Sequence, residues 1–158
     1  MKLVYAQEPF PEDLENSIFL AGPTPRSPEV KSWRPDALTI LRKKSYKGIV
    51  FMPEPRDGSF GGDFDYNEQI EWEARGLELA DCILFWVPRD LKTMPGFTTN
   101  VEFGLWVSSG KIVFGAPENA PKTKYLRIYA DKYGIPSSDT LDQTISDALN
   151  MLKNKNPV

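Results

Sequence analysis

The amino-acid sequence predicts an α/β fold, a three-layer α/β/α sandwich built on a mainly parallel sheet. Short apolar runs alternate along the chain with segments in which apolar residues recur at helical spacing, which is typical of strand–helix–strand units. The run at residues 80–87 is apolar enough for a central strand that is covered on both faces. The 158 residues, of which 41% are hydrophobic, suffice for one domain with a substantial core.

Each element follows from its own pattern. Apolar runs that end near glycine or proline predict strands, and apolar residues at helical spacing predict helices. The expected strands are residues 17–21, 48–52, 80–87 and 110–115, with a short fifth strand near 134–137. The expected helices are residues 29–45, 65–79, a segment capped by Thr98 or Thr99, 124–133 and 139–153. Residues 1–16, rich in proline and acidic side chains, are expected to be an irregular lead-in, and residues 17–158 a single domain.

The order of these strands would create a crevice at one end of the sheet. We expect the flavodoxin-like order 2-1-3-4-5, in which the first and third strands are neighbours at the switch point. The loops after Ala21 and Val87 then form the two walls of one crevice. Residues 22–27 on one wall are expected to face residues 98–102 on the other.

Composition argues against several classes of function. The net charge is -3 and Lys and Arg are scattered, which disfavours nucleic acid or an anionic membrane as a partner. No apolar run approaches the roughly 18 residues of a membrane-spanning helix, and the first ten residues do not resemble a signal peptide. A lone cysteine, Cys82, and the absence of histidine argue against a structural zinc site, and we expect neither a metal nor a cofactor. We expect a cytoplasmic protein whose partner is a small molecule.

Glu102 is the leading candidate for a catalytic residue. Without histidine, chemistry near neutral pH falls mainly to Asp, Glu, Tyr, Lys or the single cysteine. Glu102 is expected in the first turn of a helix that follows a buried strand, where unpaired backbone N–H groups favour the ionised carboxylate. Such a carboxylate can attack an anomeric carbon and form a covalent glycosyl intermediate. The alternative is a glutamate that only complements the helix dipole.

The turn after the first expected strand is a candidate anion site. Gly22 and Pro23 begin this turn, and Arg26 and Ser27 follow them shortly before a predicted helix. A glycine-containing turn before a helix suits an anion such as a 5′-phosphate. No complete phosphate-loop pattern is present, however.

Two further groups of polar residues have both a functional and a structural interpretation. Residues 63–73 offer aromatic faces, amides and carboxylates, and Tyr66 and Gln69 among them could bind a base by stacking and edge hydrogen bonds. The alternative is a solvated acidic helix start. Asp81 opens the third expected strand, either as a site residue or as an acidic group at the edge of the sheet. Sites in parallel sheets gather at the carboxyl ends of strands, which counts against Asp81.

Four segments resemble the nucleoside 2-deoxyribosyltransferase family: residues 18–23, 69–73, 80–81 and 99–104. The resemblance covers about residues 17–115 with these motifs, of which the segment around Glu102 is the most specific. It implies a flavodoxin-like domain in which Glu102 takes a deoxyribosyl group from one nucleobase and passes it to another. It also implies that Asp81 contacts the base, and that a neighbouring subunit completes the site, so that the protein is a homo-oligomer.

The chain departs from the family pattern at two positions. Phe19 stands where the family often has a tyrosine that supports the nucleophile, so that hydroxyl is missing. Gly96 stands where many transferases carry the aspartate that holds the sugar. Asp90 or Asn100 are candidates to bind the sugar in its place.

Transfer of a deoxyribosyl group between nucleobases through Glu102 is the leading hypothesis. The first alternative is hydrolysis of (deoxy)nucleoside 5′-monophosphates, with Arg26 and Ser27 on the phosphate. A non-catalytic nucleotide-binding module is the second, because the expected tyrosine and aspartate are missing. A flavodoxin-like electron carrier is the third, although no serine- and threonine-rich phosphate loop of the flavin-binding kind follows the first expected strand.

Overall fold

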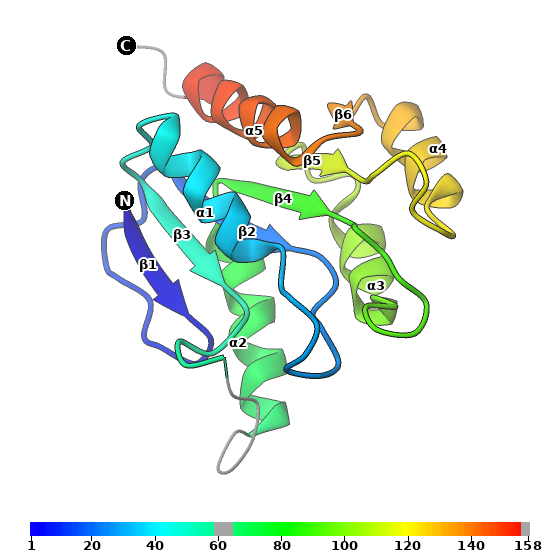
Figure 1. The fold of residues 1–158 in the computed structure, drawn as a ribbon. Helices are drawn as coiled ribbons and strands as arrows, with labels where there is room; N and C mark the ends of the chain where they lie inside the picture. Colours follow the sequence, from blue (N-terminus) through cyan, green and yellow to red (C-terminus); the bar gives the residue numbers. More distant parts are fainter. Residues whose placement is uncertain (59–64, 156–158) are drawn as a thin grey trace.

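A computed structural model describes residues 1–58 and 65–155 of the chain. From the second strand onward, strands and helices alternate along the described residues, and Figure 1 shows them in chain order. The strands are β1 (Lys2–Tyr5), β2 (Ser17–Ala21), β3 (Ile49–Met52), β4 (Cys82–Trp86), β5 (Ile112–Gly115) and β6 (Ser137–Ser138). The helices are α1 (Arg34–Lys43), α2 (Tyr66–Leu79), α3 (Phe97–Trp106), α4 (Lys124–Lys132) and α5 (Leu141–Lys155).

All six strands belong to one sheet with the order β1-β3-β2-β4-β5-β6, and every pair of neighbours is parallel. The five predicted strands correspond to β2 to β6, so the predicted order 2-1-3-4-5 is confirmed as β3-β2-β4-β5-β6. The expectation of an irregular lead-in at residues 1–16 is wrong for Lys2–Tyr5. These four residues form β1, which pairs with β3 at the edge of the sheet. Only one residue of β1 is fully buried, so the strand lacks the apolar run that marks the others.

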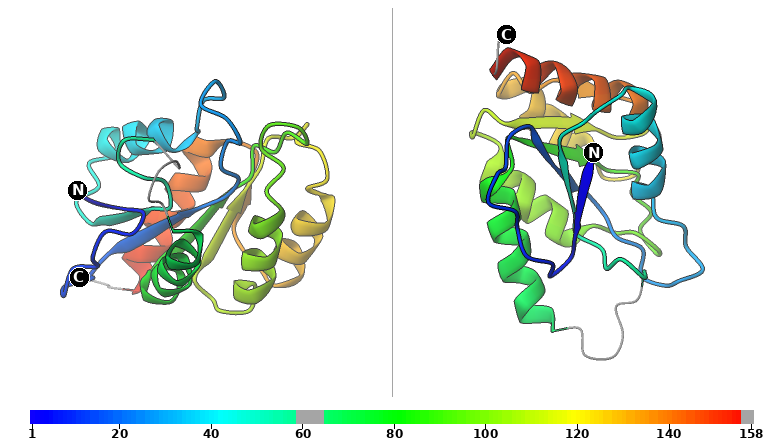
Figure 2. Two further views of the ribbon diagram at one scale, coloured as in Figure 1. Left: turned by 90° about the horizontal axis from the view of Figure 1, so that it is seen from below. Right: turned by 90° about the vertical axis from the view of Figure 1, so that its left-hand side faces the viewer.

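Helices cover both faces of the sheet and make the predicted α/β/α sandwich (Figure 2). On one face, α1 and α5 bury Leu41 and Ile145 against β2, β3 and β4. On the other face, α2, α3 and α4 pack against a core that is rich in phenylalanine. Phe103 of α3 lies edge-on to Phe85 of β4 and Phe114 of β5, with ring centroids 5.4 and 5.5 Å apart. The burial of these rings holds α3 over the centre of the sheet.

Two helices begin at positions that differ from the expected ones. Helix α1 begins at Arg34 rather than near residue 29, because Pro35 suits the first turn of a helix and residues 27–30 form a turn instead. Helix α3 begins at Phe97 after Gly96, so the expected caps at Thr98 or Thr99 are wrong. Glu102 therefore lies in the second turn of α3, beyond the unpaired N–H groups of its start.

Candidate active site

The carboxyl ends of β2 and β4 meet at Gly22. Its backbone has φ +148°, and a Cβ atom there would stand 2.1 Å from the carbonyl oxygen of Trp86. Only glycine allows the turn after β2 to approach β4 this closely. Trp33 then holds the turn from the other side, because its indole N–H donates to the carbonyl of Pro23 at 3.1 Å. The predicted switch-point crevice therefore has one fixed wall.

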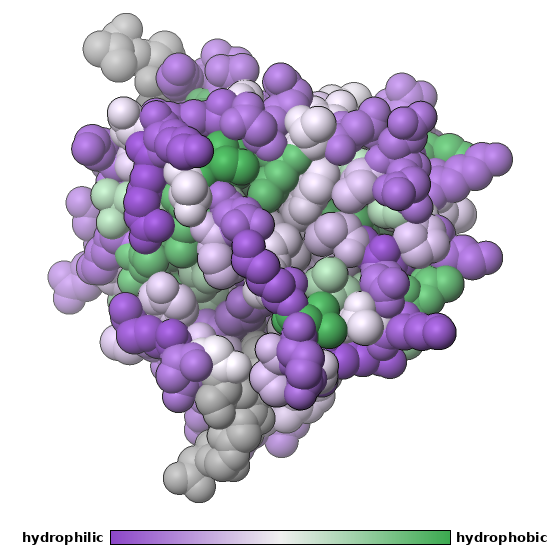
Figure 3. Space-filling view, in the orientation of Figure 1, coloured by the Kyte–Doolittle hydropathy of each residue, from purple (hydrophilic) through white to green (hydrophobic). Residues whose placement is uncertain are grey.

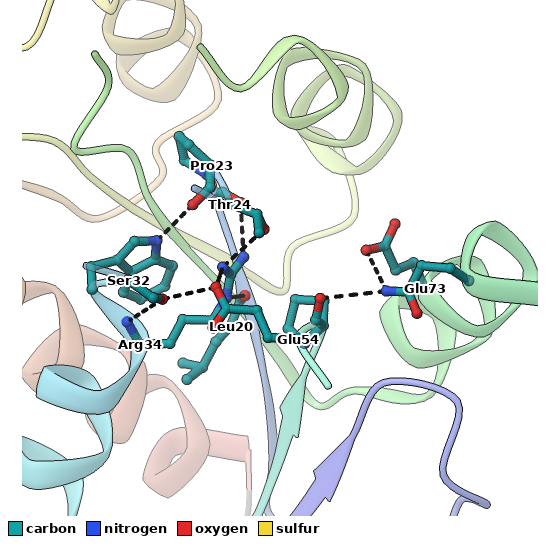
Figure 4. A network of polar contacts seen from close by, with 11 residues as sticks. Leu20, Pro23, Thr24, Ser32, Arg34, Glu54 and Glu73 are labelled. Carbon is teal, nitrogen blue, oxygen red and sulfur yellow. Dashed lines mark hydrogen bonds and ion pairs between the residues drawn. The ribbon is translucent and has the colours of Figure 1, made fainter. Parts of the chain in front are cut away.

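Arg34, the first residue of α1, is 1% exposed and also holds the turn after β2 in place. Its guanidinium donates to the carbonyl oxygens of Leu20 at 3.0 Å and Gly22 at 2.8 Å. It also donates to the hydroxyl of Thr24 at 3.1 Å and forms an ion pair with Glu54 at 2.5 Å. Figure 4 shows this network around the end of β2. A buried cation with all of these partners is a strong positional constraint on the turn.

Gly96 brings the second wall of the crevice against the first. It precedes α3 in a left-handed conformation with φ +61°, and a Cβ atom there would lie 2.8 Å from the side chain of Pro23. An aspartate at this position would therefore clash with the turn after β2. The packing of this chain therefore has no room for the aspartate that the resemblance leads us to expect at this position.

A pocket of about 220 Å³ lies between these two walls. Its lining combines residues from the turn after β2, the start of α1, helix α2 and the start of α3. They are Gly22, Thr24, Arg26, Arg34, Glu73, Pro95, Gly96, Phe97, Thr98 and Glu102. The position at the carboxyl ends of parallel strands is the usual place for a site in this class of fold.

Glu102 reaches this pocket from the second turn of α3. The pKa of its carboxyl group is raised to about 8, mainly by burial and further by the nearby charge of Glu73, while the charge of Arg34 acts in the opposite direction. The expectation that Glu102 stays ionised at neutral pH is therefore wrong. Its place beyond the first turn removes the hydrogen bonds that would have stabilised the charge, and desolvation dominates. The pocket thus holds an acid whose pKa lies near neutrality.

Glu73, from α2, is the second acidic group of the pocket, and the sequence analysis did not single it out. Burial raises the pKa of its carboxyl group, while a hydrogen bond from Gln69 and the charge of Arg34 lower it. The amide of Gln69 donates to Glu73 at 2.8 Å from one helical turn away. The sequence contained an indication of this pair. Gln69 and Glu73 are four residues apart, so they lie on the same helix face as the buried Trp72.

Several predicted substrate-binding residues meet at the pocket or beside it. Gly22, Arg26 and Glu102 line it, and Pro23 contacts its wall at Gly96. Ser27 lines an adjoining hollow of about 670 Å³ that shares Thr24 and Arg26 with the pocket. The guanidinium of Arg26 lies 5.7 Å from the ring centroid of Phe97. Gln69 is buried, and it acts on the pocket through Glu73 rather than by lining it.

Asp81 does not reach the pocket, so its expected contact with a base in the same subunit is wrong. It accepts hydrogen bonds from the backbone N–H and the hydroxyl of Ser17, at 2.9 and 3.0 Å. Both residues stand at the amino ends of β2 and β4, and the pocket lies at the carboxyl ends. Asp81 therefore joins two neighbouring strands, which is the structural interpretation of its position.

Three other candidates also lie away from the pocket. Asn100 accepts a hydrogen bond from Arg89 at 2.6 Å and faces the groove between α3 and α4. Asp90 closes its own turn by accepting from the backbone and hydroxyl of Thr93. Tyr66 is exposed at the start of α2, and residues 63–64 of the same cluster lie outside the described residues. Neither Asn100 nor Asp90 takes the place of the missing sugar-binding aspartate.

The described residues contain neither a cluster of metal ligands nor a helix that could span a membrane. In residues 1–58 and 65–155, acidic and cysteine side chains nowhere gather in threes in a way that suits a metal ion. The helices of this same part of the chain are too short or too polar to span a membrane.

Comparison with known protein families places the chain in one of them. No curated protein matches the chain. The model of the family described as "Nucleoside 2-deoxyribosyltransferase like" matches residues 15–120, which span β2 to β5 and every residue that lines the pocket. The chain therefore belongs to the nucleoside 2-deoxyribosyltransferase-like family.

Proposed function

We propose that this protein transfers a (deoxy)ribosyl group between nucleobases through a covalent intermediate on Glu102. The observation that carries the proposal is the placement of two carboxyl groups, Glu102 and Glu73, in one pocket at the carboxyl ends of β2 and β4. Double displacement at an anomeric carbon needs a nucleophile and an acid, and two carboxyl groups in one site supply both. Membership of the family supports a nucleoside as substrate.

In the first step, the carboxylate of Glu102 forms a bond to C1′ of the sugar. The bond between C1′ and the base nitrogen breaks, its electron pair goes to that nitrogen, and the base takes a proton from the carboxylic acid of Glu73. In the second step, a nitrogen of another base attacks C1′ and releases the Glu102 carboxylate. The incoming base returns its proton to Glu73, so the site regains its starting state.

The electrostatics of the pocket set a condition on this division of labour, because the pKa of Glu102 is raised to about 8 and its proton must leave before the carboxylate attacks. The pKa values of both carboxyl groups are raised, and the charge of Glu73 acts on Glu102. Two carboxyl groups in one pocket resist ionising together, because each negative charge disfavours the other. The attacking state is the one in which Glu102 is ionised and Glu73 carries the proton. The positive charge of Arg34 lowers the pKa of both groups and keeps this state accessible.

The test is base exchange. A deoxynucleoside incubated with a second free base and the protein should yield the exchanged nucleoside, separated by liquid chromatography. Replacing Glu102 by Ala or Gln should abolish the exchange, and mass spectrometry of the denatured wild-type protein should detect the glycosyl ester on Glu102. Glu71→Gln, an exposed change on α2, serves as the control with normal activity. Near-normal exchange by Glu102→Ala would refute the role of Glu102.

Hydrolysis of a (deoxy)nucleoside 5′-monophosphate is the second candidate function. The hollow beside the pocket favours it, because Arg26 lines both spaces and Ser27 lies further along the hollow. In this reaction water attacks C1′ of the Glu102 ester and gives its proton to Glu73. Release of free base from monophosphates, with no exchange of bases between nucleosides, would establish hydrolysis. Calorimetric binding of nucleotides without any product would instead establish a non-catalytic module.

A further inference from the structure

The mouth of the pocket differs in character from its interior. Glu73 and Glu102 lie half-buried inside, whereas the exposed side chains of the lining are Arg26, Phe97 and Thr98. Phe97 is 69% exposed and is the one aromatic residue among the described residues of the lining. The guanidinium of Arg26 lies over its ring, 5.7 Å from the ring centroid. An acidic interior therefore opens through a mouth that carries a cation and an aromatic ring.

Two contacts between the walls of the crevice place this pair. Phe97 follows Gly96, whose left-handed backbone packs against the side chain of Pro23. The backbone N–H of Arg26 donates to the carbonyl of Thr93 at 3.0 Å, which ties the turn after β2 to the loop after β4. In the described part of the chain, no carboxylate pairs with the guanidinium of Arg26. The backbone under both residues is therefore held in place, while their side chains are exposed and the guanidinium is free to move.

The pocket is smaller than a site that encloses a whole ligand. Its volume is about 220 Å³, whereas pockets that enclose a drug-sized ligand hold roughly 300–1,000 Å³. If Glu102 is to reach C1′, as the proposed function requires, the sugar occupies the interior beside the two carboxyl groups. The base then lies at the mouth. The adjoining hollow offers the base no ring to stack on, because none of the described residues that line this hollow is aromatic.

We propose that the nucleobase stacks between the ring of Phe97 and the guanidinium of Arg26. Bases stack on aromatic rings and on the planes of arginine side chains. Contacts of about 3.5 Å on both faces of a base need about 7 Å between ring and guanidinium rather than 5.7 Å, so the side chain of Arg26 moves outward by about 1 Å. Because the substrate is taken to be a nucleoside with its sugar at Glu102, this placement rests on the proposed function. It replaces the expected base contact of Asp81, which lies at the opposite end of the sheet.

Stacking on both faces makes the site tolerant of the identity of the base. Every base has a face to stack, so selection by stacking follows the area of the ring system, and purine deoxynucleosides should bind more tightly than pyrimidine ones. The third exposed lining residue, Thr98, has a hydroxyl that both donates and accepts, so it does not distinguish an amino group from a keto oxygen. Deoxyadenosine and deoxyinosine, which differ in one such edge group, should bind within about tenfold of each other, whereas a site that reads this edge by hydrogen bonds separates such ligands by about 10⁴-fold.

Phe97 differs in one respect from the other exposed apolar residues of α3. Val101 and Leu105 follow it at intervals of four residues and are 63% and 72% exposed, but neither lines the pocket. On the face of the molecule over α1 and α5, hydrophilic residues predominate (Figure 3). Apolar exposure is thus shared by several residues of α3, whereas a place in the lining with a guanidinium over the ring belongs to Phe97. Leu105, equally exposed and outside the pocket, is the matched control.

The first experiment measures the binding of deoxyadenosine by calorimetry, with Glu102→Gln as the parent so that turnover does not interfere. Phe97→Ala should weaken this binding by about 5- to 150-fold, the range expected when a stacking ring is removed. Phe97→Tyr keeps the ring and should bind within about threefold of the parent. Leu105→Ala should bind as the parent does. Circular dichroism verifies that each variant is folded.

Equal binding by Phe97→Ala and the parent would overturn the proposal. So would a loss in Leu105→Ala as large as that in Phe97→Ala, because the effect would then belong to the apolar surface of α3 and not to the pocket.

The second experiment changes the ligand instead of the ring of Phe97. Dihydrothymidine keeps the edge groups of thymidine but lacks its flat aromatic ring. Thymidine should therefore bind at least about fivefold more tightly than dihydrothymidine, and this preference should disappear in Phe97→Ala. Equal binding of the two ligands by the parent, or a preference that persists in Phe97→Ala, would contradict stacking on Phe97.

A pair of ligands separates stacking on Arg26 from phosphate binding by the same residue. Arg26→Ala should weaken the binding of deoxyadenosine and of its 5′-monophosphate by the same factor, about 2- to 30-fold, because both lose the cation over the base. Arg42→Ala, an exposed change on α1, is the control and should alter neither. A loss confined to the monophosphate would overturn the stacking role of Arg26 and assign it to the phosphate.

The stacking site and the proposed function fail in different ways. If Phe97→Ala weakens binding while Glu102→Gln still exchanges bases, the stacking site stands and the role of Glu102 falls. If exchange depends on Glu102 but Phe97→Ala binds and exchanges as the wild type does, only the stacking site falls. A wild type that binds no nucleoside overturns both.

Discussion

Replacing Glu102 by glutamine is expected to stabilise the folded protein at neutral and alkaline pH while abolishing catalysis. The pKa of Glu102 is raised from 4.5 to about 8, mainly by burial. Above pH 4.5 the unfolded chain releases this proton, whereas the folded protein keeps it until about pH 8. Folding therefore loses stability as the pH rises across that window, and glutamine, which has no proton to release, removes the loss.

The magnitude follows from the same two values. Each pKa unit corresponds to about 1.36 kcal/mol, so the shift sets an upper limit of about 5 kcal/mol. Because the side chain keeps partial contact with the solvent in the pocket, we expect about 2–3 kcal/mol at pH 8 and above, and no difference below pH 4.5. Urea unfolding of both proteins from pH 4.5 to 9 measures the difference.

The exposed substitution Glu71→Gln is the control and should follow the wild type at every pH. A Glu102→Gln variant that is no more stable than the wild type at pH 8, or whose advantage does not grow with pH, would refute the placement of Glu102 in a desolvating pocket.

Three further predictions concern the partners of Glu102. Glu73→Gln should lower the activity and shift the rise of kcat/KM to lower pH, because removing the charge of Glu73 lowers the pKa of Glu102. A pH–rate profile measures this shift. A shift to higher pH would contradict the prediction. Arg34→Met should destabilise the fold by about 3–5 kcal/mol in urea unfolding, because it removes the cation from the half-buried Glu54 and leaves the carbonyl oxygens of Leu20 and Gly22 without their donor. A loss below about 1 kcal/mol would count against the network. Gly96→Ala should cost about 1–3 kcal/mol and weaken substrate binding, since its φ is +61° and the added Cβ meets Pro23; wild-type KM and Tm together would argue against this packing.

Local patterns in the sequence predicted much of the fold. Strands β2 to β5 are apolar runs with clear ends, and the flavodoxin-like order expected for alternating strands and helices is the order in which they lie. Strand β1 was missed because pairing with β3, not its own sequence, makes it a strand. The start of α3 was misplaced because Gly96, in a left-handed conformation against Pro23, begins the helix without a side-chain cap. Both errors concern contacts between residues far apart in the chain, which a local pattern does not contain.

The sequence by itself determined the position of Glu102 after a buried strand and the glycine turn that faces it. Only the tertiary structure decided which residues join it. Glu73 and Arg34 come from α2 and α1, and they share a pocket with Glu102 because the sheet order places the ends of β2 and β4 side by side. The tertiary structure also places Asp81 at the end of the sheet opposite to the pocket. It also decided the protonation of Glu102, because desolvation depends on the atoms packed around a carboxyl group and not on its neighbours in the chain.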